Sequence, residues 1–379
     1  MSYINPEILT WARERVGMSI EELASKTKRP IEEVEMWESG EKVPAYGKLE
    51  DMAYKYYKVP IAVFFFPYPP QIEDPVNRFR KLPDFEFERF SPDTYKKIRL
   101  AQTYQDSLVD VLHGNESEKS IIRKFSGITK TPQKLAKKVR KFLGVSFEEQ
   151  FDFRSSDTAF KRWRYALEQV GVFTFKDTFK DRFISGFCLV DDDYPLVMIN
   201  NSNAFTRQIF TLIHELGHIL LGVDGITEVD ETFFDFLSNS ELKTEIYCNQ
   251  FASEFLVPSD EFKNDIELFQ QEGMDAISEI AENYSVSREV ILRRLLDNNI
   301  ISKSKYFEKS GEWNKDYLRR SKGAGGGNYY LTKISYLGES FTKYAFIQNQ
   351  KGSFSRSQLA SHLNVKVKNL GKLEASVRW

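Results

Sequence analysis

The sequence predicts a mainly α-helical protein that contains one α+β domain and begins with an all-α domain. Apolar residues recur with helical spacing through most of the 379 residues, whereas short β-like runs gather between residues 172 and 200. The chain is too long for one ordinary core, and its 41% hydrophobic and 28% charged residues are typical of globular proteins. We therefore expect two or three domains. Local patterns divide the chain at residues 1–68, 69–157, 158–302 and 303–379, with the second part as a connector.

The composition also narrows the setting of the protein. Two cysteines, Cys188 and Cys248, are too few for a disulfide framework in a chain of this length, which favours a reducing compartment. Met1–Val16 lacks the pattern of a secretory leader, and no apolar run approaches a membrane-spanning length. We therefore expect a cytoplasmic protein without membrane contact. The net charge of −2 excludes binding to nucleic acid by overall charge alone.

The first part, residues 1–68, shows the pattern of four or five short helices between Pro6 and Tyr57. Ser19 followed by Glu22 predicts a capped start for the second helix, and Pro30 is suited to the first turn of the third. This spacing predicts a helix-turn-helix domain, an arrangement that many DNA-binding proteins use. Its candidate DNA-contacting residues are Lys28, Arg29 and Trp37.

The charge of this domain favours a different role. Residues 1–60 hold nine Lys or Arg against eleven Asp or Glu. The expected recognition helix carries four of these carboxylates, at Glu32, Glu33, Glu35 and Glu38. Carboxylates that face DNA phosphates are repelled, because affinity for duplex comes largely from cations. Protein docking or homodimer formation is therefore the alternative to DNA binding.

Residues 69–157 form a helical connector, and the α+β domain begins at residue 158. A helix at its start leads into β-like runs at Val172–Phe175, Phe187–Val190 and Pro195–Asn200, which suit a small sheet. Two strong helices and then a helical pair follow, at Thr206–Gly222, Glu241–Val257, Asp275–Tyr284 and Ser287–Asn298.

The last part, residues 303–379, follows a glycine-rich joint at Gly323, Gly325, Gly326 and Gly327. From residue 301 onward the chain has fifteen Lys or Arg against five Asp or Glu. This basic segment is suited to contact with nucleic acid, and a solvated module that packs on the α+β domain is the alternative.

The run His214-Glu215-Leu216-Gly217-His218 carries the strongest chemical signal. Two histidines four residues apart on one helix present their rings on one face, which suits two positions of a tetrahedral Zn²⁺ shell. Glu215 lies about 100° further round the helix, beside the open position of the ion, where it can take a proton from an attacking water. The chain has only four histidines, and we expect the other two, His113 and His362, to be structural.

A catalytic zinc site needs a third protein donor, and we expect Glu245, on the next helix. Asn249, one turn later, is placed to hydrogen-bond a metal-bound histidine. Arg207 and Tyr247 are further candidates to stabilise an oxyanion, and the alternatives to Glu245 as a ligand are Asp224, Glu228, Asp230, Glu231 and Glu241. The run Pro195–Asn200 is expected to pair with an extended substrate, with Val197, Ile199 and Asn200 as the substrate-strand residues.

These motifs resemble the ImmA/IrrE family of bacterial and phage metallopeptidases. The family pairs an HELGH helix with a later E-x-x-(A/C)-N-x-F-A segment, which correspond here to His214–His218 and Glu245–Ala252. The resemblance covers roughly Val170–Val257 and includes Arg207. It implies a zincin-like, gluzincin-type peptidase domain that binds Zn²⁺ and cleaves a transcriptional repressor, which derepresses phage, mobile-element or stress genes.

The N-terminal domain is similar to the phage-repressor, or XRE, type of helix-turn-helix, which commonly precedes this peptidase domain. The main alternative comes from another class of protein. It is a DNA-binding transcription regulator or antitoxin-like protein in which the peptidase fold senses a ligand and cleaves nothing.

Overall fold

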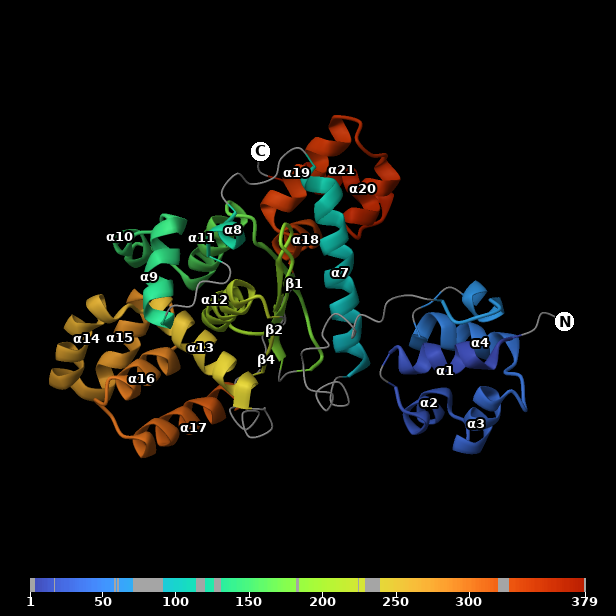
Figure 1. Ribbon diagram of the computed structural model, residues 1–379, viewed down its shortest axis with the longest axis horizontal. Helices are drawn as coiled ribbons and strands as arrows, with labels where there is room; N and C mark the ends of the chain where they lie inside the picture. Colours follow the sequence, from blue (N-terminus) through green and yellow to red (C-terminus); the bar gives the residue numbers. More distant parts are fainter. Residues whose placement is uncertain are drawn as a thin grey trace. The chain divides into compact units, whose positions relative to one another are not determined.

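The computed structural model divides the chain into two compact units, Met1–Leu100 and Ala101–Trp379 (Figure 1). The structure describes residues 4–16, 18–57, 59, 61–70, 91–113, 120–125, 131–181, 184–223, 225–228, 239–319 and 327–377. Within these ranges, no helix combines the length and the apolar character that crossing a membrane requires. The prediction of a mainly helical chain with a small sheet is confirmed.

The first unit is built from short helices around one apolar core that includes Ile8, Leu23, Val34, Trp37 and Phe64. The Ser19 hydroxyl accepts a hydrogen bond from the Glu22 amide at 3.1 Å, which caps the second helix as predicted. The elements are α1 (Pro6–Glu14), α2 (Ile20–Thr27), α3 (Ile31–Ser39), α4 (Tyr46–Asp51), a π-helical turn (Met52–Tyr57) and a 3₁₀ turn (Ile61–Phe65).

The prediction that Trp37 contacts DNA is wrong. Trp37 is only 3% exposed and belongs to the apolar core of the first unit, so its indole cannot reach a phosphate or a base edge. Lys28 and Arg29, by contrast, are exposed at the turn between α2 and α3. The assignment of this unit as a DNA-binding domain stays a prediction.

The division between the units falls within α7 (Pro92–Leu112), and the other elements of the second unit follow in chain order. The first helices are α8 (Ile121–Phe125), α9 (Pro132–Leu143), α10 (Phe147–Phe151) and α11 (Ser156–Glu168). The sheet region contains β1 (Phe173–Asp177), β2 (Ile184–Leu189), β3 (Leu196–Asn200), α12 (Phe205–Leu221) and β4 (Gly225–Glu228). The remaining elements are α13 (Asn239–Leu256), α14 (Ser259–Glu272), a 3₁₀ turn (Gly273–Asp275), α15 (Ala276–Asn283), α16 (Arg288–Asp297), α17 (Lys303–Arg319), α18 (Tyr329–Leu337), α19 (Glu339–Gln350), α20 (Arg356–His362), a 3₁₀ turn (Val367–Asn369) and α21 (Leu370–Glu374).

The four strands form one mixed sheet in the order β1-β3-β2-β4. Strand β3 is parallel to β1 and antiparallel to β2, and β2 is antiparallel to β4. Helices α11 and α12 cover one face, where Lys176 of β1 lies against the rings of Phe160 and Phe205 at 4.8 and 4.9 Å. On the other face Phe175 stacks on Tyr104 of α7 and contacts Phe341 of α19 (Figure 1). The sheet therefore lies between two helical layers.

The prediction that Val197, Ile199 and Asn200 bind an extended substrate is wrong. Their strand, β3, pairs with β1 along its whole length and with β2 along most of it, so its backbone offers no free edge to another chain. All five residues of β3 are buried. The Asn200 amide donates to the Ile184 carbonyl at 2.8 Å, and its side-chain oxygen accepts from the Ser202 amide at 2.9 Å, so Asn200 fixes the end of the sheet.

Helices of the predicted connector pack into the same core as the predicted peptidase domain. Leu135 and Val139 of α9 belong to the cluster that contains Trp163 of α11, Leu212 of α12 and Phe255 of α13. The predicted boundary at residue 157 therefore falls inside one core. Of the predicted glycine-rich joint, Gly323, Gly325 and Gly326 lie outside the described residues.

Candidate metal centre

Helix α12 carries two of the three candidate metal ligands in its buried part. Its apolar residues surround His214 and His218, and the two side chains are 1% and 2% exposed. The helix ends at Gly222, whose left-handed backbone (φ 71°) allows the Val223 amide to bond the His218 carbonyl at 3.1 Å. Glycine adopts this conformation without steric cost, so the chain can turn sharply after α12 and enter β4.

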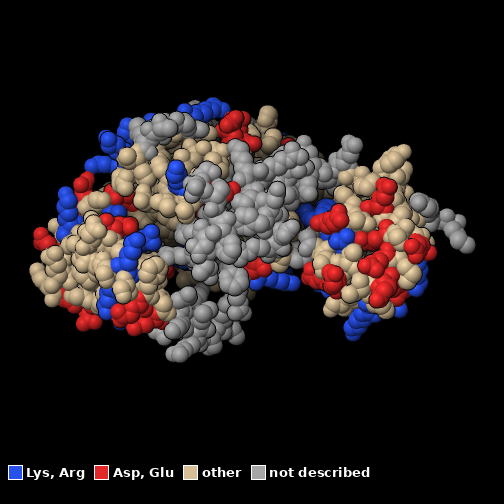
Figure 2. Space-filling model, turned by 60° about the horizontal axis from the view of Figure 1, so that its bottom comes forward, with Lys and Arg blue, Asp and Glu red and all other residues tan. Residues whose placement is uncertain are grey.

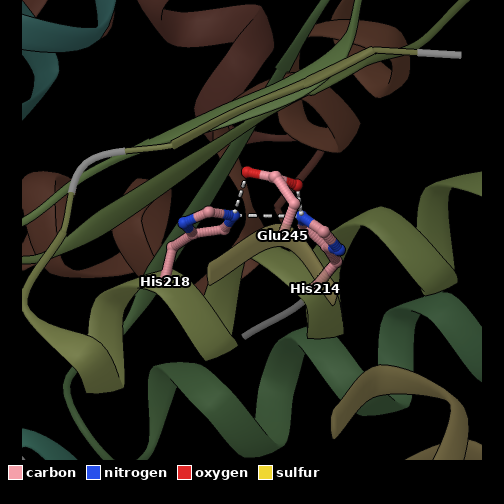
Figure 3. A group of neighbouring side chains, drawn as sticks. All are labelled: His214, His218 and Glu245. Carbon is pink, nitrogen blue, oxygen red and sulfur yellow. Dashed lines mark hydrogen bonds and ion pairs between the residues drawn. The ribbon is translucent and has the colours of Figure 1, made fainter. Parts of the chain in front are cut away.

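Helix α13 supplies the third candidate ligand because it packs closely on α12. A Cβ atom added to Gly217 would lie 3.1 Å from the Cys248 Sγ and 3.3 Å from the Phe251 ring. A larger residue at position 217 would therefore push the two helices apart. The close approach brings the carboxylate of Glu245, one turn before Cys248 and Asn249, to the two imidazoles (Figure 3).

The three side chains point their donor atoms at one another (Figure 3). The Nε2 atoms of His214 and His218 are 3.0 Å apart, and the Glu245 oxygens lie 3.2 and 3.0 Å from them, respectively. All the donor atoms lie within 4.8 Å of one another. Tetrahedral zinc with bonds of about 2.0–2.1 Å separates its donors by roughly 3.3 Å. The donor set thus fits a divalent ion in both chemistry and spacing.

The ring of His214 is oriented by Asn249 of α13. The Nδ1–H of His214 donates to the Asn249 Oδ1 at 3.0 Å, which leaves the lone pair of Nε2 directed toward Glu245. Metal-binding histidines are commonly held in this way by a second hydrogen bond on the opposite ring nitrogen.

Replacing Asn249 with alanine is therefore expected to weaken zinc binding by about ten- to a hundredfold, because the His214 ring loses its orienting partner. Competition with a zinc indicator dye measures the affinity. Gln250→Ala is the matched control, since Gln250 is the next residue on α13 and is exposed. Equal affinities of the two variants would show that Asn249 does not orient the ligand.

The ring of His218 is held by the backbone of β4. A Cβ atom added to Gly225 would lie 2.6 to 2.8 Å from three atoms of this ring, so only glycine permits the contact. The Cys248 side chain interacts with the same histidine from α13, and burial raises the pKa of the Cys248 thiol. Neither residue was identified from the sequence, because both contacts arise between elements that are distant along the chain.

The substitution Gly225→Ala is expected to displace β4 or the His218 ring and to lower both stability and zinc affinity. Overpacking at a buried site of this kind costs about 1–3 kcal/mol. Urea unfolding and zinc titration check the two effects. Gly311→Ala in α17, where an added Cβ meets no atom within 4 Å, is the control and is expected to leave both unchanged or slightly improved. A wild-type urea midpoint for Gly225→Ala would refute the close contact.

Charge couples the three candidate ligands. Burial alone would lower the pKa of His218, but the side chains of Cys248 and Glu245 outweigh burial and hold this pKa well above its ordinary value. Burial alone would raise the pKa of Glu245, but His218 and His214 hold it well below its usual range. The negative charge of Glu245 therefore favours a positive charge at His218, which either a proton or a metal ion can supply.

Zinc binding is accordingly expected to release a proton and to strengthen as pH rises through neutrality. A histidine binds a metal ion only as the neutral imidazole. Zinc therefore competes with the proton on His218 at every pH below the raised pKa of this residue. Calorimetric titration with zinc in two buffers of different ionisation enthalpy measures the number of protons released. Identical heats in both buffers would contradict the prediction.

Residues 167–296 match the family model of the IrrE N-terminal-like domain, Peptidase_M78. This match supports a metallopeptidase of the ImmA/IrrE type, and we call the matched segment the IrrE-like domain. The segment contains the whole sheet and helices α12 to α15, and therefore all three candidate ligands. No curated protein matches the chain.

The structure also places the other predicted residues of the IrrE-like domain. Glu215 is fully buried in α12, directly after His214. Arg207, in the first turn of α12, donates from Nε to the Ser185 hydroxyl of β2 at 3.2 Å, and Tyr247 is half-buried on α13. Of the alternative ligands, Asp224, Asp230 and Glu231 lie outside the described residues, as does the side chain of Glu228.

Proposed function

We propose that the chain is a zinc-dependent endopeptidase that cleaves a transcriptional repressor. The observation that carries the proposal is the convergence of His214, His218 and Glu245 in a segment that matches a metallopeptidase family. A zinc ion held by these residues would supply Lewis acidity, which polarises a scissile carbonyl and makes water a stronger nucleophile.

Glu215 serves as the general base in this proposal. It is adjacent to His214, so its carboxylate starts about 100° further round α12 than the ligand, beside the three donors rather than among them. A carboxylate in that position takes a proton from the attacking water and delivers it to the leaving amine. Asn249 keeps His214 in the tautomer that a metal ligand requires.

The substrate pairs, in our proposal, with β4 rather than with β3. Among the described residues, β4 is the last strand of the sheet and is bonded on one side, to β2. Its Gly225 lies against the ring of His218, so a peptide extended along this edge passes the candidate ligands. Backbone pairing of this kind holds a peptide in the extended conformation that hydrolysis needs.

The test uses the full chain with zinc and, as candidate substrates, the transcriptional repressors encoded near its gene. We expect defined cleavage products by mass spectrometry, their loss on addition of a zinc chelator, and their return when zinc is restored. Duplex DNA that contains the operator is included in a parallel reaction to detect stimulation. Tight zinc binding combined with an intact repressor in both reactions would contradict the proposal and favour a regulator that cleaves nothing.

A further inference from the structure

We propose that the last helices of the chain, residues 339–377, bind duplex DNA. These residues are called the C-terminal module below and comprise α19, α20, the 3₁₀ turn Val367–Asn369 and α21. The module contributes none of the three candidate metal ligands, so this binding activity is separate from the proposed hydrolysis.

The turn in this module has the backbone of a helix-turn-helix. Helix α20 is followed by Asn364 in the left-handed conformation (φ 49°), and the second helical stretch begins at Val367. The Val365 amide bonds the Ala360 carbonyl at 2.9 Å, which closes the end of α20. A tight left-handed turn of this kind redirects the chain, so the second helix crosses the first.

The N-terminal unit contains the same turn between α2 and α3. Lys28 is left-handed (φ 55°), and the Arg29 amide bonds the Ala24 carbonyl at 3.0 Å. The buried positions also fall at the same offsets from the left-handed residue. Leu359, Ala360, Leu370 and Leu373 correspond to Leu23, Ala24, Val34 and Trp37, and all eight are buried. The chain therefore repeats one helix pair with two different surfaces.

A third copy of this turn shows that the backbone alone does not make a DNA-binding surface. Ser285 is left-handed (φ 56°) between α15 and α16, and the Val286 amide bonds the Ala281 carbonyl at 2.9 Å. On α16, however, Leu292 is fully buried in the core of the second unit. Its counterpart in the C-terminal module is Gly371, which is exposed. The second helix of the C-terminal module is thus open where α16 is covered.

Cations occupy the open face of the C-terminal module. Lys366, Lys368 and Lys372 lie on or directly before its second helix, Arg356 begins α20, and all four are exposed. Within the described part of the chain, none of the four makes an ion pair. Glu374, the one carboxylate within residues 351–377, accepts from the Gln350 amide at 3.2 Å. Asp110 of α7 lies 3.7 Å from His362 of α20.

The matching face of the N-terminal unit has the opposite charge. Residues 351–377 hold five Lys or Arg against one Glu, whereas the corresponding residues 15–41 hold four against seven. Glu21, Glu32 and Glu35 are exposed there, and Asp and Glu side chains spread over the face of this unit that Figure 2 shows. If one of the two open helix pairs binds DNA, charge assigns that role to the C-terminal one.

The geometry favours duplex DNA over RNA. In a helix-turn-helix the second helix enters the major groove while the first crosses the backbone. This arrangement places Lys366, Lys368 and Lys372 within reach of the phosphates that border the groove, and Arg356 beside a phosphate of the crossed backbone. The major groove of B-form DNA admits a helix, whereas that of A-form RNA is too narrow.

The experiment measures binding of the full chain to a fluorescent 30-base-pair DNA duplex of mixed sequence over a series of salt concentrations. The test variant is K366A/K368A/K372A, whose exposed positions leave the fold intact, as circular dichroism and thermal melting verify. We expect its affinity to fall by at least about tenfold, and the slope of log affinity against log salt to decrease by about 3, since each phosphate contact contributes close to one unit.

The matched control is K26A/K28A/R29A, which removes three cations around the same turn of the N-terminal unit and is expected to keep wild-type affinity and slope. Several results would overturn the proposal: no binding by the wild-type chain at about 50 mM salt, where phosphate contacts are strong, a loss in the control equal to that in the test variant, or tighter binding to an RNA duplex of the same sequence. Because Glu215→Gln is expected to bind DNA like the wild type, a failure of the peptidase proposal would leave this result unaffected.

Discussion

Replacing Glu215 with glutamine is expected to lower peptide cleavage by about a hundredfold to ten-thousandfold while zinc binding is retained. Glutamine has nearly the same shape as glutamate but cannot accept the proton of the attacking water. Since Glu215 is not among the three converging donors, the zinc site itself should persist. Initial rates of repressor cleavage and zinc content per chain, measured on the same preparation, give both results.

The control for this variant is Glu279→Gln, which makes the same chemical change at an exposed position of α15. It is expected to cleave at the wild-type rate. Cleavage by Glu215→Gln at a comparable rate would remove Glu215 from the mechanism, whereas loss of zinc from this variant would show that Glu215 has a ligand or structural role instead.

Replacing Glu245 with glutamine is expected to have the largest effect on the affinity for zinc. The neutral amide removes the only carboxylate among the three donors, and two buried imidazoles with a neutral partner hold a divalent cation poorly. Zinc affinity should fall by more than about a hundredfold, because loss of outer partners alone costs ten- to a hundredfold. The rise in melting temperature that zinc confers on the wild type should disappear with it.

Glu241→Gln provides the matched control because Glu241 precedes Glu245 by one turn on α13. The sequence also allows Glu241 as an alternative third ligand. The variant is expected to bind zinc normally and to melt like the wild type. Loss of zinc in Glu241→Gln with retention in Glu245→Gln would reverse the assignment of the third donor.

Short-range patterns in the sequence predicted the helices and the pairing of His214 with His218. Four residues on one helix span about one turn, so the spacing of the two histidines fixes their common face without knowledge of the fold. Glu245 required an assumption about which helix packs on α12, and the structure places its carboxylate beside both imidazoles. The contacts of Gly225 and Cys248 with His218 depend on tertiary packing, which no local pattern encodes.

The errors have equally physical causes. The prediction that β3 receives substrate fails because a continuous apolar run is typical of a strand buried on both faces, as β3 is. The predicted DNA contact of Trp37 fails because the offset of this residue from the turn places it in the core. The repeated turn at Lys28, Ser285 and Asn364 was missed because few side chains are identical between the three copies.

Among the described strands β4 lies at the margin of the sheet, and this position has a consequence for the proposed selection of substrates. In the proposed pairing with β4, a polypeptide would be held mainly through its backbone amides and carbonyls, which every sequence possesses. Those groups are already satisfied inside the helices and sheets of a folded target. Under the proposed function, scission would be confined to stretches that the substrate leaves without regular structure or releases by local unfolding. The conformational stability of the substrate, more than its sequence, would then determine where it is cut.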